Sequence, residues 1–112
     1  MENCLFCKLA SGEIPTNKAY EDDSVLAFHD IAPQAPVHIV VIPKMHIADG
    51  VRDITADNAN TVAHIFEVIP QIAQAAGITD YRIVSNNGDD AGQTIPHLHF
   101  HILGGRRLGE MG

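Results

Sequence analysis

Residues 96–105 read PHLHFHILGG, a stretch in which three of the chain's seven histidines alternate with apolar residues. Successive side chains of a strand point to opposite faces of its sheet, so this period of two predicts a β-strand over residues 97–103. Leu98, Phe100 and Ile102 are expected to pack under a helix, and the histidines to share the other face. These histidines are His97, His99 and His101. Three imidazoles in register need hydrogen-bond partners and add little packing, which indicates a functional face.

Outward from this strand, the chain carries the other elements of a small domain. Runs rich in β-branched and aromatic residues predict strands at 18–21, 25–29, 37–43 and 81–86. Residues 54–77 repeat apolar side chains with the helical period, with Thr55 as the expected N-cap and Gly77 as the residue that ends the helix. Pro70 should kink this helix or split it in two.

This order of elements predicts the α+β class, because strands and helices do not alternate regularly. We expect a roughly five-stranded antiparallel sheet, one long helix on one face, and a short N-terminal helix that Gly12 and Pro15 end. The chain of 112 residues suits a single domain, 1–112. Its N-terminal CxxC segment is placed at 1–15 and its C-terminal tail at 105–112.

Composition argues against two kinds of partner. The formal net charge of −7 leaves no broad basic face for nucleic acid. The sequence shows neither an apolar run long enough for a membrane span nor a signal peptide. We therefore expect a cytoplasmic protein with no nucleic-acid and no membrane partner.

The three histidines allow two functional interpretations. They ligate a catalytic metal, as neutral imidazoles do in zinc enzymes, or one is a nucleophile while the others hold the substrate. The preceding residues favour the second interpretation. Asn86, Gln93 and Thr94 are neutral donors suited to phosphate or sugar oxygens, and no carboxylate lies beside the histidines to complete a metal site. A neutral imidazole suits attack on phosphorus, since its unperturbed pKa is about 6.5.

Three segments resemble the histidine triad family, specifically its branch of purine nucleoside phosphoramidate hydrolases, the histidine triad nucleotide-binding proteins. They are QTIPHLHFHILGG at 93–105, FHDIAPQAPVHIVVIPKMH at 28–46 and YRIVSNNGDDAGQ at 81–93. The similarity extends from Cys4 to Arg106. It implies the histidine triad fold, a homodimer, an AMP or GMP conjugate as substrate, and no catalytic cofactor. His101 stands where the related uridylyltransferases have glutamine, which points to hydrolysis.

The resemblance implies a role for each matching residue near the phosphate. His99 would attack the α-phosphorus and form a nucleotidyl-histidine, and His101 would donate a hydrogen bond to a phosphate oxygen. Thr94, where the family often has serine, would help to protonate the leaving amine. Gln93 and Asn86 would contact the phosphate.

The resemblance also implies how the nucleoside binds. Asp30 would accept hydrogen bonds from the ribose hydroxyls, as carboxylates commonly do with a vicinal diol. His38 matches a fourth histidine that lies behind the triad as an outer partner. The wall of the base pocket would consist of Leu26, Phe28, His29 and Ile31.

Cys4 and Cys7 form a C-x-x-C, which in a reducing compartment favours a metal or a redox pair over a structural disulfide. Tetrahedral zinc needs two further nitrogen or sulfur ligands. Family members with such a pair complete it with two histidines, which match His46 and His97. The resemblance therefore implies structural zinc, and it leaves the other two triad histidines for phosphate chemistry.

Other functions stay open at this level. They are hydrolysis of dinucleoside polyphosphates, a metal-dependent hydrolase that uses the three histidines as ligands, and a non-catalytic nucleotide-binding adaptor protein. His64, in the predicted long helix, is not expected to take part in catalysis. The tail RRLGEMG at 106–112 departs from the most similar hydrolases, which often end in a segment bearing Trp and Pro near the active site. Specificity for the leaving group therefore does not follow from the resemblance.

Overall fold

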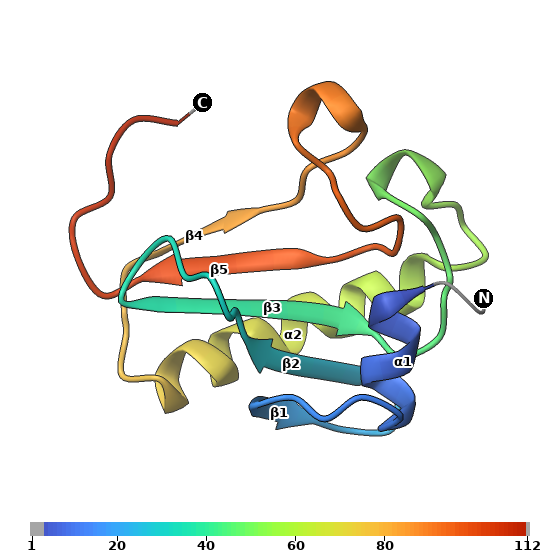
Figure 1. Ribbon diagram of the computed structural model, residues 1–112, viewed down its shortest axis with the longest axis horizontal. Helices are drawn as coiled ribbons and strands as arrows, with labels where there is room; N and C mark the ends of the chain where they lie inside the picture. The colour runs from blue at the N-terminus through green and yellow to red at the C-terminus, as the bar shows by residue number, and fades with distance from the viewer. Residues whose placement is uncertain (1–3, 112) are drawn as a thin grey trace.

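Two α-helices and five strands make up residues 4–111, the part of the chain that this computed structural model describes (Figure 1). Residues 1–3 and 112 of the predicted domain lie outside the described residues. The elements in chain order are α1 (Leu5–Ser11), β1 (Lys18–Glu21), β2 (Val25–His29), β3 (Val37–Pro43), α2 (Ala59–Ala75), β4 (Tyr81–Val84) and β5 (Phe100–Gly104), with 3-10 turns at Val51–Asp53 and Asp89–Ala91. Neither described helix is long and apolar enough to cross a membrane.

The strands form one antiparallel sheet in the order β1-β2-β3-β5-β4. Helix α2 covers one face and α1 packs against the other (Figure 1). The alternation along β3 separates the two layers. Ile39 and Val41 pack with the apolar stripe of α2, whereas Val40 and Ile42 pack with Phe6 of α1. The predicted α+β fold is thus confirmed, with a sheet buried on both faces at its centre.

Strand boundaries agree with the prediction for β1, β2 and β3 but not for the other two strands. β4 ends at Val84 instead of residue 86, and β5 begins at Phe100 instead of residue 97. Pro43, at the end of β3, has no N–H to donate to a neighbouring strand. The register that pairs Val41 with Phe100 would place Pro43 opposite Leu98, and the N–H of Leu98 donates to the carbonyl of Ala48 at 2.9 Å instead. The carbonyl of His99 accepts a hydrogen bond from Ser85 Oγ at 2.7 Å, just after β4 ends at Val84. The predicted alternation still holds, because the three apolar residues between and after the histidines lie in the core under α2.

Helix α2 begins four residues after the predicted N-cap, Thr55. The Thr55 hydroxyl accepts the N–H of Asp57 at 3.2 Å, and its own N–H donates to Asn58 Oδ1 at 2.8 Å. These bonds hold residues 55–58 in turns before the helix. Gly77 ends the helix as predicted, with a φ of 77°. Pro70 does not split the helix; its ring is exposed, and the buried residues around it keep α2 against the sheet.

Candidate active site and metal centre

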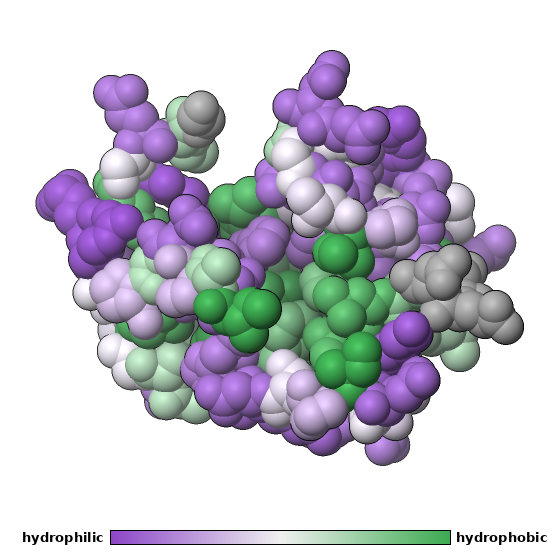
Figure 2. All heavy atoms as spheres, in the orientation of Figure 1, coloured by the Kyte–Doolittle hydropathy of each residue, from purple (hydrophilic) through white to green (hydrophobic). Residues whose placement is uncertain are grey.

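The predicted triad lies at the N-terminal end of β5, on the sheet face that carries α1. His97 is fully buried, His99 is 6% exposed and His101 is half-buried. The rings of His99 and His101 lie edge to face, with centroids 5.1 Å apart. Figure 2, which views this face, shows apolar residues in a hollow between α1 and the segment that joins β2 to β3, with hydrophilic residues around it.

Within the described part of the chain, the His99 ring has one nitrogen bound to the backbone and one without a hydrogen-bond partner. Its Nδ1 lies 2.7 Å from the carbonyl oxygen of His97. A carbonyl only accepts, so Nδ1 carries the proton and Nε2 of the neutral ring keeps its lone pair. Burial lowers the pKa of His99, which favours the neutral ring. The arrangement therefore offers a nucleophilic nitrogen at Nε2.

His101 has the opposite arrangement, which a chain of hydrogen bonds determines. The N–H of Gln34 donates to Nδ1 of His38 at 3.1 Å, so the proton of neutral His38 is on Nε2. That Nε2 lies 2.9 Å from Nδ1 of His101 and donates to it. The other nitrogen of His101, Nε2, therefore carries a proton and can donate to an oxygen.

The pKa values of this pair keep both rings neutral. Burial, together with the neighbouring His99 and His38, lowers the pKa of His101 to about 4. Burial also lowers the pKa of His38, although the carboxylate of Asp30 opposes it. A neutral His101 is the form that accepts at one nitrogen and donates at the other.

Asp30, His38 and His101 also have ligand atoms within 4.8 Å of one another, close enough for a second metal site. A metal ligand needs a lone pair on the nitrogen that faces the ion. Nε2 of His38 lacks one, because the Gln34 N–H occupies Nδ1 and places the proton on Nε2. The carboxylate of Asp30, 3.5 Å from the same nitrogen, adds a second acceptor for that proton. The hydrogen bonds thus argue against a catalytic metal held by these groups.

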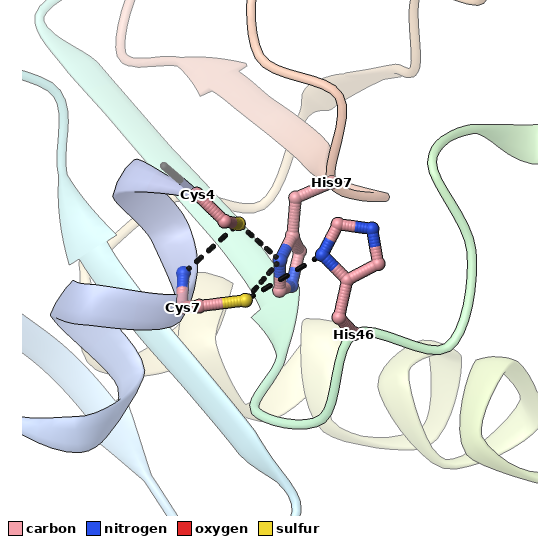
Figure 3. A group of neighbouring side chains, drawn as sticks. All are labelled: Cys4, Cys7, His46 and His97. Carbon is pink, nitrogen blue, oxygen red and sulfur yellow. Dashed lines mark hydrogen bonds between the residues drawn. The ribbon is translucent and has the colours of Figure 1, made fainter. Parts of the chain in front are cut away.

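Cys4, Cys7, His46 and His97 form what we call the metal cluster, in which each side chain points a ligand atom toward the others (Figure 3). The Sγ–Nδ1 distances are 3.2 Å from Cys4 to His97 and 3.5 Å from Cys7 to each histidine. Bonds of about 2.3 Å from zinc to sulfur and about 2.1 Å to nitrogen, at tetrahedral angles, separate such atoms by about 3.6 Å. The four residues could therefore hold a metal ion, and their spacing fits zinc.

Both histidines of the metal cluster present the nitrogen that a metal needs. Nε2 of His97 lies 2.8 Å from the carbonyl oxygen of Pro43, and Nε2 of His46 lies 2.6 Å from Oδ1 of Asp49. These acceptors take the ring proton, so the lone pairs at Nδ1 face the two sulfurs. A carboxylate or carbonyl behind each imidazole is the usual outer arrangement of a metal-bound histidine.

The two thiols of the metal cluster differ in acidity. Burial raises the pKa of Cys4, but hydrogen bonds from Cys7 outweigh it and the pKa lies below its usual value. Burial and the neighbouring Cys4 raise the pKa of Cys7 to about 11. One thiolate therefore forms more easily than two, until a cation neutralises the pair.

Gln93, a predicted phosphate contact, has its side chain fully engaged within the protein. Its Oε1 accepts the N–H of Gly88 at 2.8 Å. Its Nε2 donates to the carbonyls of Asp49 at 2.6 Å and Ile95 at 3.1 Å. Both amide hydrogens are used, so Gln93 holds the loop in place instead of offering an open amide. Among residues 4–111, the exposed Thr94 and the half-buried Asn86 have no such side-chain bonds.

The predicted nucleoside-binding residues divide into exposed and buried ones. His29 and Ile31 are exposed, on either side of the half-buried Asp30, whose Oδ1 accepts the N–H of Ala32 at 2.8 Å. Phe28 and Leu26 are buried in the apolar cluster beneath α1. Leu26 is 0% exposed and therefore has no surface for a ligand.

Two contributors to the site were missed in the sequence. Phe6 lies between the two cysteines, and its ring contacts those of His97, His99 and Phe28 edge to face. An aromatic residue inside a C-x-x-C was the one available signal. Gln34 acts through its backbone N–H, which leaves no side-chain pattern to detect.

Other polar features lie away from the triad. Nε2 of His64, on α2, is 2.7 Å from Oδ2 of Asp22, in the turn between β1 and β2. A cavity of about 580 Å³ lies at the other end of β5, lined by residues 77–82 and 105–108. None of the predicted site residues lines this cavity.

Comparisons with known proteins agree with this geometry. The family model described as HIT domain matches residues 11–108. A purine nucleoside phosphoramidase of Escherichia coli (strain K12) is 41% identical over 112 residues, covering 98% of this chain and 93% of that protein. A HIT family hydrolase from Clostridium thermocellum superimposes with a TM-score of 0.94 at 43% identity, covering 99% of this chain and 97% of that one. A histidine triad protein from Clostridium difficile gives a TM-score of 0.94 at 47% identity, with coverage of 100% and 98%. The chain therefore belongs to the histidine triad (HIT) domain family.

Proposed function

We propose that this protein is a hydrolase that releases AMP or GMP from a phosphoramidate or an acyl-nucleotide through a nucleotidyl-histidine intermediate on His99. Membership of the HIT family and the name of the Escherichia coli relative support the reaction class. The observation that carries the proposal is the pair of opposite tautomers. Nε2 of His99 is an acceptor and Nε2 of His101 is a donor, on rings 5.1 Å apart.

In the first step Nε2 of His99 attacks the phosphorus. The P–Nε2 bond forms, the P–N bond to the leaving group breaks, and its electron pair stays on the leaving nitrogen, which takes up a proton. The exposed Thr94 hydroxyl would pass that proton on and recover one from water. Nε2–H of His101 would donate to a non-bridging oxygen; a donor of this kind contributes about 3 kcal/mol to transition-state stabilisation.

In the second step a water molecule attacks the phosphorus. The P–Nε2 bond breaks and returns its electron pair to His99. The proton that the water loses balances the proton that the amine gained, so one water is consumed per turnover. Throughout, the hydrogen bond from Nδ1 to the carbonyl of His97 supports the positive charge of the phosphorylated ring.

The nucleoside would bind on the exposed rim next to these histidines. The half-buried carboxylate of Asp30 suits the ribose hydroxyls, and the exposed side chain of Ile31 suits one face of a base. Phe28 would form the floor beneath the base, although 6% exposure leaves it little free surface before a ligand binds.

The mechanism is tested by trapping the intermediate. The protein is mixed with an adenosine phosphoramidate, quenched early in alkaline denaturant and weighed as an intact chain. A mass increase of one AMP is expected, which His99→Ala abolishes and the control His64→Ala retains. Neither turnover nor adduct with adenosine and guanosine phosphoramidates or an acyl-adenylate would overturn the proposal. Nucleotide binding without turnover would favour an adaptor, and turnover confined to a dinucleoside polyphosphate would favour that substrate class.

We also propose that the metal cluster holds structural zinc. Zinc there would tie α1 to the start of β5, and the reaction steps use other side chains. Elemental analysis should find one zinc per chain in the wild type and none in Cys7→Ser. Complete and immediate loss of turnover on chelation, with the fold unchanged, would contradict a structural role, whereas a partial slowing would not.

A homodimer is the proposed assembly. Within residues 4–111, β4 is an edge strand with β5 on one side only, and its Ile83 is 37% exposed. Pairing of two copies along β4 would cover this edge and join two sheets into one. Sedimentation should show a dimer that Ile83→Lys weakens; a wild-type monomer at micromolar concentration would contradict the assembly.

A further inference from the structure

Phe6 connects the metal cluster with the proposed nucleophile. It lies between the two cysteine ligands in sequence, and its ring is 7% exposed. Its centroid lies 5.1 Å from that of His99 and 5.9 Å from that of His97, with the rings nearly perpendicular in both contacts. Phe6 thus touches both the residue that would bind the metal and the residue that would attack the substrate.

The backbone adds two connections to the metal cluster. The carbonyl of His97 accepts the Nδ1–H of His99 at 2.7 Å. Asp49, whose carboxylate holds His46, also accepts Nε2–H of Gln93 through its carbonyl at 2.6 Å. Both histidine ligands are therefore tied to the loop and strand end that carry the nucleophile. Phe6 connects the two cysteines of the metal cluster to the same nucleophile, because it lies between them on α1.

The single bond at Nδ1 does not by itself fix the plane of the His99 ring. The edge-to-face contact with Phe6 limits rotation of that ring, because Phe6 is itself packed against Phe28 at 5.5 Å. Helix α1 has only seven residues, too short to be stable without tertiary contacts. Its position depends on the apolar cluster and on the ties from Cys4 and Cys7 to His97.

We propose that Phe6 is a positioning residue that makes the alignment of His99 depend on occupancy of the metal cluster. This proposal rests on the proposed function of His99. With the metal cluster filled, α1 is fixed and Phe6 holds the His99 ring in line with the phosphorus. With it empty, α1 loosens, Phe6 withdraws, and the ring samples positions from which attack is slow. An error of about 1 Å in such alignment can cost about 100-fold in rate.

The first test compares Phe6→Leu with a matched variant on the same helix. Leu9 is buried in the same apolar cluster and makes none of the ring contacts described for Phe6, so Leu9→Ala controls for lost packing. In the metal-loaded proteins, rapid-quench kinetics at saturating substrate should show adduct formation roughly tenfold to 100-fold slower in Phe6→Leu. Leu9→Ala should lower the melting temperature but keep the rate within about threefold. The dissociation constant for AMP should change by less than about threefold in both.

The second test removes the metal with a chelator and follows the ring nitrogens of His99 by NMR. In the wild type, chelation should shift and broaden the His99 signals and slow adduct formation by about the same factor as Phe6→Leu. In Phe6→Leu, chelation should add less than about threefold, because the connection is already broken. If the metal-free protein unfolds, the role of Phe6 is judged from the comparison of Phe6→Leu with Leu9→Ala in the metal-loaded proteins.

Three results would overturn the proposal. Weaker AMP binding with an unchanged rate at saturation would make Phe6 only a part of the base pocket. Equal slowing in Phe6→Leu and Leu9→Ala would reduce its role to packing. Independent, multiplicative effects of chelation and Phe6→Leu would remove the coupling. If the wild type forms no adduct at all, the proposed function fails, while the NMR comparison still tests the coupling.

Discussion

His97 of the metal cluster and His99, the proposed nucleophile, lie two positions apart in the chain, yet their imidazoles carry the proton on opposite nitrogens. In the metal cluster, His97 and His46 donate from Nε2 to oxygen acceptors, and both keep a lone pair at Nδ1. Beside it, His99 donates from Nδ1 and keeps its lone pair at Nε2. The residue type is the same in both cases. The acceptor behind each ring therefore decides which nitrogen keeps the lone pair that a metal ion or a phosphorus atom would meet.

The largest expected effect separates these two roles directly. His99→Ala should lower the turnover rate by about 10⁴-fold or more, because no other group replaces the nucleophile. His97→Ala should instead release the metal. Steady-state kinetics and metal content are measured on both variants. If His97→Ala kept its metal, or His99→Ala lost it, the assignment of the two rings would be wrong.

Removal of the metal should act on stability first. A ligand that binds only the folded chain, free at about 1,000 times its dissociation constant, adds about 4 kcal/mol to the free energy of unfolding. Chelation should remove that amount in wild type and nothing further in Cys7→Ser. Urea titrations with and without chelator test this. An equal effect of chelator on both proteins would show that the metal acts elsewhere.

His38 should affect the rate without touching the metal. His38→Leu removes the donor that places the proton of His101 on Nε2, so the oxygen donor at the phosphate is lost. We expect the turnover rate to fall by roughly 10²- to 10³-fold. His38→Gln, which can still donate, should recover part of it. Equal turnover rates in His38→Leu and wild type would show that His38 does not determine the proton position of His101 during the reaction.

The smallest effects concern pH and have opposite signs in two parts of the molecule. The pKa of His101 is about 4 in the folded chain and about 6.5 in the unfolded chain. Burial, His99 and His38 lower the folded value, and Asp30 opposes them. The unfolded chain therefore binds more protons between these values, and the free energy of unfolding falls as pH decreases from about 6.5 to 4. His101→Gln should lose less stability over this range than wild type, by on the order of 1–3 kcal/mol. Parallel urea curves at pH 7 and 4.5 test it.

The pair of His64 and Asp22 should behave in the other direction. The hydrogen bond that His64 donates to the carboxylate of Asp22 raises the pKa of His64. This contribution to stability is therefore complete below about pH 6.5 and is lost as pH rises through the folded pKa. His64→Ala should therefore lose stability at pH 6 and very little at pH 9. The same loss at both pH values would mean that the contact stabilises through packing alone.

The sequence predicted those parts of the fold that depend on alternation. Burial of Leu98, Phe100 and Ile102 under α2 followed from the period of two. The late start of β5 did not, because it depends on Pro43 in another strand, which has no N–H to offer. The late start of α2 was not predicted either, because it depends on which local hydrogen bonds Thr55 makes. A threonine can cap a helix or hold a turn before it, and the sequence does not say which.

Within the site, the structure places Cys4, Cys7, His46 and His97 together, as the resemblance implied, although no local pattern links the two cysteines to the two histidines. Side-chain identity alone leaves the role of Gln93 open. An amide suits a phosphate and a backbone carbonyl equally well, and here both of its hydrogens go to carbonyls. The contact of Phe6 with His99 joins segments far apart in the chain, and apolar contacts carry no signature of their own.

The span of the metal cluster also bears on the order of assembly during synthesis. Cys4 and His97 are 93 positions apart, and His97 lies just upstream of the last strand of the sheet, which begins at Phe100. Loop-closure entropy delays contacts of such separation until intervening structure brings the ends together. The cysteines leave the ribosome early but meet their full ligand set only when nearly the whole domain has emerged. A cation would therefore bind at this cluster after the sheet has assembled, and would stabilise a fold that is already formed. In zinc fingers, by contrast, metal binding itself drives folding.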